Sequence, residues 1–212
     1  MTDKAYQKRR LQEALKLRPE IKIIKFLGGG NHGEAYSTEN GYVIKITNDK
    51  EEYCTAKLLI GKKLRHIIEI YECWRFKCVY TDGDSDFLYC IIEEHIDTDS
   101  KKEIISNFVG QFKHAWFSLY FPNFEYKNGT FDDLERCMKK QYFYANAIQY
   151  TKQFVLTEGE KRYSRKDFET LHDQLLAAYD ELNAYVPQSH LDLNDGNLGL
   201  SSKGVLKIFD IQ

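Results

Sequence analysis

The sequence lacks the features that would assign it to a membrane or secreted class. Among its 212 residues, no uninterrupted apolar run approaches the roughly 20 residues that a membrane-spanning helix needs. The N-terminus is charged, and polar residues interrupt the apolar positions that follow it, so no secretory signal is expected. Internal repeats and low-complexity segments are absent as well. We therefore expect a soluble, intracellular, globular protein with no membrane partner.

No charge of one sign dominates, because 30 Lys and Arg residues are balanced by 32 Asp and Glu residues, for a net charge of -2. This balance argues against a strongly basic nucleic-acid binder, so no nucleic-acid partner is expected. The five cysteines are odd in number and irregularly spaced, which is typical of reduced thiols in a cytosolic protein. Cys73 and Cys78 have no second pair at metal-ligand spacing, and we interpret them as strand residues.

The first 95 residues are predicted to form a helix followed by a sheet. Residues 1–20 hold the helix, which Thr2 caps and which runs to about Leu17. The pattern then changes to that of strands, with a hairpin turn at Asn40-Gly41. One further helix is expected from Asp49 to Leu64. The strands are expected near residues 21–27, 34–37, 42–46, 67–76 and 87–93.

The remainder, residues 96–212, is expected to be mostly helical. It begins with an aromatic-rich insert at about 98–165, and an amphipathic helix follows at about 166–185. The polar segment 190–197 comes directly after that helix, and a hairpin is expected after it. The chain is therefore predicted to be an α+β protein.

Glycines gather between the first two predicted strands, in the pattern Gly28-x-Gly30-x-x-Gly33-x-Ala35. Glycine lets the backbone approach phosphates closely, and the backbone amides there can hold their negative charge. By itself the pattern is weak, since a glycine turn between strands needs no ligand. A dinucleotide-binding fingerprint is disfavoured because a strand, and not a helix, is expected to follow.

Lys45 ends an apolar stretch of the third predicted strand, where its ammonium group would contact phosphates. The alternative is a solvated lysine on an amphipathic strand, which is common. A carboxylate on the next helix could hold Lys45 in place for that contact, and both Glu51 and Glu52 are candidates. Glu52 is preferred because it lies one helical turn before Ala56, although either residue would also favour a helix N-terminus.

The strongest cluster lies at the C-terminal end of the chain. His190, Asp192 and Asn197 follow the spacing H-x-D-x-x-x-x-N, and Asp210 closes the apolar run 205–209. A hairpin between Asn197 and Asp210 would bring the acidic groups toward one metal site. Each of these residues, taken alone, is common in ordinary loops.

Together and in this order, these segments resemble the protein-kinase-like superfamily, from about Ile21 to Asp210. The resemblance is closest to the minimal kinases of bacterial effectors and phages. It implies a two-lobed fold, with an antiparallel-sheet N-lobe at 21–95 and a reduced, mostly helical C-lobe at 96–212. It also implies a phosphotransferase that uses ATP and Mg²⁺.

The resemblance also implies a role for each matching residue. Asp192 would be the catalytic base, and His190 would support its loop. Lys45, paired with Glu52, would position the ATP phosphates beneath the glycine loop. The other implied roles are Mg²⁺ ligation by Asn197 and Asp210, adenine pairing by the backbone of Glu93 and His95, and a gatekeeper position at Ile92.

Several departures from the family pattern concern the acceptor. Leu191 replaces the arginine that often precedes the catalytic aspartate, and Asn194 stands where many serine/threonine kinases have lysine. Ile211-Gln212 replaces Phe-Gly, and no activation segment or Ala-Pro-Glu motif follows. We expect either a naturally minimal protein or a piece of a longer one. An activating partner that completes the reduced lobe is a further candidate.

Three functions follow from the resemblance. A minimal serine/threonine-type protein kinase is favoured by the complete glycine loop. A small-molecule phosphotransferase of the aminoglycoside type is favoured by the long stretch between Glu93 and Asp192, if the insert 98–165 builds a pocket for a small hydroxylated acceptor. That insert is more simply explained as a packed core, because aromatic residues at helical spacing usually point inward. A pseudokinase binding module, which would act by docking and not by catalysis, is the third.

The expected location is the cytoplasm, or the host cytosol for an effector or phage protein.

Overall fold

The computed structural model describes residues 3–30, 32–80, 83–96, 98, 102–110, 165–186 and 196–209. The chain divides into two compact units, Met1–Ile96 and Asp97–Phe209. The described elements of the first unit are α1 (Asp3–Leu15), β1 (Ile23–Gly29), β2 (Gly33–Thr38), β3 (Tyr42–Thr47), α2 (Lys50–Leu59), β4 (Ile70–Val79) and β5 (Ser85–Glu94). Those of the second unit are α6 (Arg165–Asn183), β6 (Leu198–Leu200) and β7 (Leu206–Ile208), and residues 102–110 are also helical.

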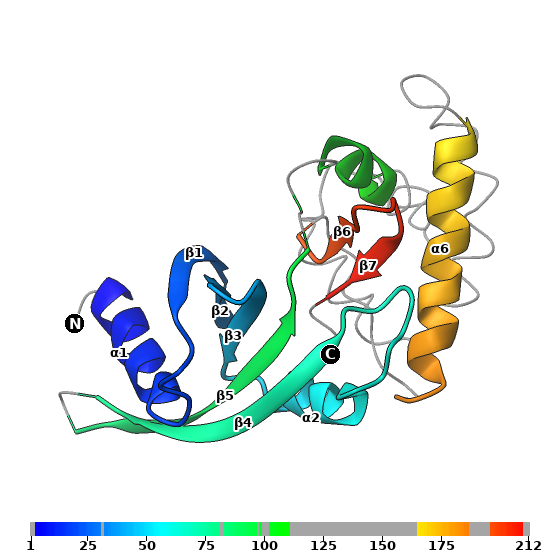
Figure 1. Ribbon diagram of the computed structural model, residues 1–212. Coiled ribbons are helices and arrows are strands. Elements are labelled where there is room, and N and C mark those ends of the chain that lie inside the picture. Colours follow the sequence, from blue (N-terminus) through cyan, green and yellow to red (C-terminus); the bar gives the residue numbers. More distant parts are fainter. Residues whose placement is uncertain are drawn as a thin grey trace, which may run out of the picture. The chain divides into compact units, whose positions relative to one another are not determined.

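The five strands of the first unit form one antiparallel sheet in the order β1-β2-β3-β5-β4 (Figure 1). This confirms the predicted α+β class and its five-stranded antiparallel sheet. The hairpin at Asn40-Gly41 is present, and Gly41 takes the left-handed conformation (φ 79°) that such a turn requires. Cys73 and Cys78 both lie on β4, and the four cysteines that the structure describes are free thiols.

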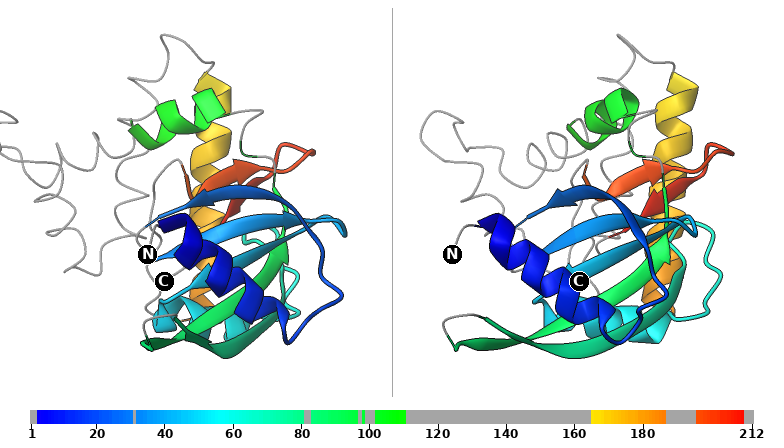
Figure 2. Two further views of the ribbon diagram at one scale, coloured as in Figure 1. Left: turned by 90° about the vertical axis from the view of Figure 1, so that its left-hand side faces the viewer. Right: turned by 60° about the vertical axis from the view of Figure 1, so that its left-hand side comes forward.

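The two helices of the first unit cover opposite faces of this sheet (Figure 2). α1 packs on one face through Ala14, which is fully buried against Tyr36, Ile44 and Ile46. α2 packs on the other face, where Ala56 and Leu59 are buried against β4 and β5. Both faces of β3 are therefore covered, which explains why Val43 on the α2 side is buried as well as Ile44 and Ile46 on the α1 side.

α2 is shorter than predicted, since it ends at Leu59 and not at Leu64. The chain leaves the helix at Ile60, whose ψ of 126° is not helical, and turns at Gly61, where φ is 71°. The amide of Lys62 closes this turn by donating to the carbonyl of Leu59 at 2.9 Å. The Gly61 amide instead donates to the carbonyl of Ile70 at 3.2 Å, and Ile60 forms an isolated parallel bridge with Ile70. As a result β4 begins at Ile70, later than expected. α1 likewise ends two residues early, at Leu15.

In the second unit, α6 packs against the hairpin that β6 and β7 form. Leu171, Leu175 and Leu182 are buried along one side of α6, at the spacing of an amphipathic helix. The amide of Leu206 donates to the side-chain carbonyl of Gln174, which ties β7 to α6. The hairpin turns at Gly204, where φ is 74°. In the described part of the chain, no helix is both long and apolar enough to cross a membrane.

Candidate functional site

One row of residues crosses the sheet on the face that α2 covers. The strand register pairs Gly28 with Ala35, Ala35 with Lys45, and Lys45 with Ile91. Residues paired across antiparallel strands lie on the same face of a sheet. The predicted site residues Gly28, Ala35 and Lys45 are thus neighbours in space, on β1, β2 and β3.

Lys45 forms an ion pair with Glu52 of α2, with 2.5 Å between Lys45 Nζ and Glu52 Oε1. Their side chains are only 14% and 6% exposed, so the pair is largely removed from water. Glu51, the other candidate partner, is exposed to solvent. The structure thus joins Lys45 to the glutamate that helical spacing preferred.

Asp49 fixes the position of Glu52 on the helix. It is the N-cap of α2, and its carboxylate accepts hydrogen bonds from the backbone amides of Glu51 and Glu52, at 2.7 and 3.2 Å. A cap of this kind satisfies amides that have no partner within the helix. Asp49 was predicted only as the start of the helix. Its part in holding Glu52 against Lys45 follows from its place one turn before that residue.

The glycine loop connects β1 to β2, and its glycines differ in what surrounds them. A Cβ atom on Gly33 would lie 2.5 Å from the carbonyl oxygen of Ile46, so this glycine is required by close packing against β3. A Cβ atom on Gly28 or Gly30 would meet nothing within 4 Å. Neither of those two has a positive φ, so packing and backbone conformation leave their identity unexplained. Open space beside such a backbone is what a phosphate cradle needs.

This difference gives a test of the loop. Gly33→Ala is expected to lower the free energy of unfolding by about 1–3 kcal/mol, because the methyl group must displace a backbone carbonyl. Gly28→Ala is expected to leave stability unchanged, or slightly raised, because no atom opposes the methyl group. If the loop binds phosphate, however, Gly28→Ala will weaken the binding of ATP. Chemical denaturation and nucleotide titration of both variants measure the two effects separately.

The residues predicted to contact adenine, Ile92, Glu93 and His95, lie at or just after the end of β5. The register pairs Ile92 with Ile44, which belongs to the α1 side of the sheet, whereas Ile91 and Glu93 share the face of Lys45. The gatekeeper assignment to Ile92 is therefore not supported by the register, which puts Ile91 on the relevant face. His95 follows the strand and is exposed.

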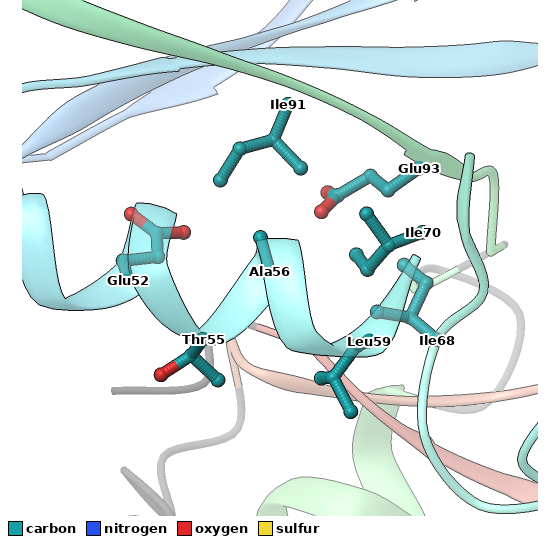
Figure 3. Close-up of a pocket in the computed structure, with 8 residues that line it drawn as sticks. All are labelled: Glu52, Thr55, Ala56, Leu59, Ile68, Ile70, Ile91 and Glu93. Atoms are coloured by element: carbon teal, nitrogen blue, oxygen red, sulfur yellow. The ribbon is translucent and has the colours of Figure 1, made fainter. Parts of the chain in front are cut away.

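Glu93 is buried, and it lines a small cavity between α2 and the sheet together with Glu52 (Figure 3). Its carboxylate points into the space between Ile91 and Ala56. The cavity has a volume of about 20 Å³, which is room for about one water molecule and far too little for a nucleobase. This interior space is thus part of the packing behind Lys45, not a ligand pocket.

The hairpin of the second unit was predicted from the segment between Asn197 and Asp210. It is present, with Leu198 opposite Ile208, and the amide of Phe209 donates to the carbonyl of Asn197 at 3.0 Å. The hairpin thus returns the chain to Asn197 at Phe209, the residue before Asp210 in the sequence. Asn197 itself is buried.

Three of the predicted site residues, His190, Asp192 and Asp210, lie outside the described residues. Within the described ranges, no three His, Cys, Asp or Glu side chains gather as a metal site would require. The side-chain amide of Asn197 remains a suitable oxygen donor for Mg²⁺.

In comparisons with known proteins, no protein-family model matches this chain, and no curated protein matches its sequence.

Proposed function

We propose that this protein is an ATP- and Mg²⁺-dependent phosphotransferase of the two-lobed protein-kinase-like fold, which transfers the γ-phosphoryl group to a hydroxyl. The favoured acceptor is a serine or threonine of a protein. The observation that supports this most is the buried ion pair between Lys45 and Glu52. It joins a lysine of the third strand to a glutamate of the next helix, beside the row that includes Gly28 and Ala35.

The pair is difficult to explain by stability alone. A solvated lysine on an amphipathic strand was the simple alternative, but the Lys45 side chain is 14% exposed. Burying two charges costs several kcal/mol per ion, and well-packed apolar residues in their place are often as stabilising or more so. A held ammonium group is useful when an anion must be bound, and Lys45 lies on the same face as Gly28.

The open space beside Gly28, on the face of Lys45, is the proposed place of the nucleotide phosphates, which backbone amides and Lys45 would hold. Bound Mg²⁺ supplies charge neutralisation of the phosphates, and Asn197 and Asp210 are its proposed ligands. Asp192 would orient the acceptor hydroxyl and accept its proton. Catalysis in this class rests on positioning and electrostatics, so few residues are required.

Transfer of label from γ-labelled ATP tests the proposal. The full chain and its Asp192→Ala variant are each incubated with Mg²⁺ in a cell lysate, which is then separated into protein and small-molecule fractions. We expect labelled protein bands that are present with the wild-type chain and absent with Asp192→Ala, and the same comparison decides each outcome below. Label in small molecules alone would identify a metabolite or drug phosphotransferase. Absence of transfer in both fractions would contradict the proposed catalysis, and a thermal shift with ATP, with and without Mg²⁺, would then show whether a nucleotide-binding pseudokinase remains.

A further inference from the structure

α1 contacts the start of β2, where the glycine loop ends, on the face of the sheet opposite Lys45. Arg10 of α1 lies 3.4 Å from the carboxylate of Glu34, measured from Nη1 to Oε1. The Arg10 Nε atom also donates to the hydroxyl of Tyr80 at 3.2 Å, which fixes the guanidinium group above the sheet. Glu34 is the residue after Gly33, so this contact is made at the point where the loop rejoins β2.

The Glu34 carboxylate needs this cation, because Glu34 is only 4% exposed. A buried carboxylate is costly unless hydrogen bonds and an opposite charge compensate it. The hydroxyl of Tyr36 donates one hydrogen bond to Glu34. Burial, and then this hydrogen bond, raise the pKa of Tyr36, so the hydroxyl stays a donor at every ordinary pH. Arg10 supplies the compensating charge.

The strand that leads into the glycine loop, β1, is also held on the face that α1 covers. Phe26 of β1 packs edge-on against Tyr36, with 5.4 Å between the ring centroids. Beyond these side chains, an open hollow of about 750 Å³ is lined by Tyr6, Gln7 and Arg10 of α1 on one side. Gly29, Gly30 and Gly33 line it on the other. The hollow leaves α1 without close packing against these glycines, whereas Arg10 reaches Glu34 beside them.

We propose that Arg10 is a positioning residue for the glycine loop, and that α1 controls the shape of this loop through the contact between Arg10 and Glu34. When α1 is packed on the sheet, it holds the start of β2, and with it the end of the glycine loop, in place. When α1 is released, this part of the loop becomes more mobile. The inference rests on the proposed function for the loop's ligand, the phosphates of ATP. It adds to that function a route by which the N-terminal helix regulates nucleotide use.

The test combines hydrogen–deuterium exchange with kinetics on the full chain. Arg10→Ala is expected to speed amide exchange in peptides that cover residues 27–36 by about tenfold, the effect of losing one hydrogen bond to a charged group. The KM for ATP is expected to rise by a similar factor, while kcat changes less than twofold. Arg10→Lys, which keeps the charge, is expected to recover most of both effects.

Two controls separate this role from general stability. Arg9→Ala removes a neighbouring arginine of α1 that contacts Glu13 and the carbonyl of Val79, and it is expected to leave loop exchange and KM unchanged. The double variant Arg10→Ala/Glu34→Gln keeps the hydrogen-bond acceptor for Tyr36 without a buried charge, so it should fold stably. Loop exchange is expected to remain fast in it, because the link to α1 is still missing.

Unchanged exchange at residues 27–36 in both Arg10→Ala and the double variant would overturn the inference, as would equal effects of Arg9→Ala and Arg10→Ala. The exchange experiment needs no nucleotide. It therefore decides the role of Arg10 even if the wild-type chain fails to use ATP, a result that would contradict the proposed function alone.

Discussion

Asp192→Ala is expected to abolish phosphoryl transfer from ATP. If Asp192 orients the acceptor hydroxyl and accepts its proton, its loss should lower kcat by about 10²- to 10⁴-fold, the usual contribution of general acid–base catalysis. ATP binding should be largely spared, because Lys45 and the glycine loop are proposed to carry it. Transfer from γ-labelled ATP measures the first effect, and the ATP-induced thermal shift measures the second.

Asp195→Ala is the matched control, because it removes the same charge three residues away in the same segment. It should retain transfer, which would separate the specific role of Asp192 from the charge of its surroundings. Wild-type turnover in Asp192→Ala would remove this residue from its assigned role. Equal loss in both variants would point to a disturbed segment, and not to a missing base.

The sheet could be predicted from the sequence because its strands carry strong local patterns. The turn at Asn40-Gly41 and the polar segment before Phe87 separate short apolar stretches, a pattern that favours strands. Their order, β1-β2-β3-β5-β4, keeps most sequential strands adjacent. The hairpin after Asn197 was predictable for the same reason.

Other features depend on contacts that no local pattern contains. Leu64 continues the helical spacing of the apolar residues of α2, but the chain leaves the helix at Ile60, where ψ is 126°, and turns at the left-handed Gly61. Ile91 and Ile92 are identical and adjacent, so their faces are decided by pairing with β3 and not by their own pattern. A register shift of one residue between β3 and β5 would put Ile92, and not Ile91, on the face of Lys45.

The candidate site shows the same division. Helical spacing gave a preference for Glu52 over Glu51, but the choice depends on where the Asp49 cap begins the helix. The contact between Arg10 and Glu34 could not be predicted from the sequence, because it depends on which face of the sheet α1 covers, and no local pattern gives that. Sequence therefore identified residue types suited to the chemistry, while the register and caps determined which of them meet.

Removing one member of the Lys45–Glu52 pair should destabilise the fold and also impair nucleotide use. Lys45→Met takes away the cation that faces the buried Glu52 carboxylate, and Glu52→Leu takes away the anion that faces Lys45. Each change is expected to lower the free energy of unfolding by about 3–5 kcal/mol, the usual cost of breaking a buried ion pair. Chemical denaturation measures it.

Glu51→Gln is the matched control for these variants. Glu51 lies in the same turn of α2 and also lies next to the Asp49 cap, but its side chain is exposed. Its replacement should change stability by no more than about 0.5 kcal/mol, as is usual for surface positions. A loss comparable to that of Glu52→Leu would assign the effect to the helix N-terminus, not to the ion pair.

The double variant Lys45→Met/Glu52→Leu separates the two roles of the pair. With both charges replaced by apolar side chains, stability should return to within about 1–2 kcal/mol of wild type, because apolar replacement of a buried pair is often neutral or better. Phosphoryl transfer should stay lost, since no ammonium group remains to hold the phosphates. Recovered transfer in the double variant would show that the pair is structural, and Lys45 would then have no place in the proposed mechanism. A stable but inactive double variant would mean that the buried Lys45–Glu52 pair is needed for phosphoryl transfer and not for stability, because the apolar replacements fold equally well without it.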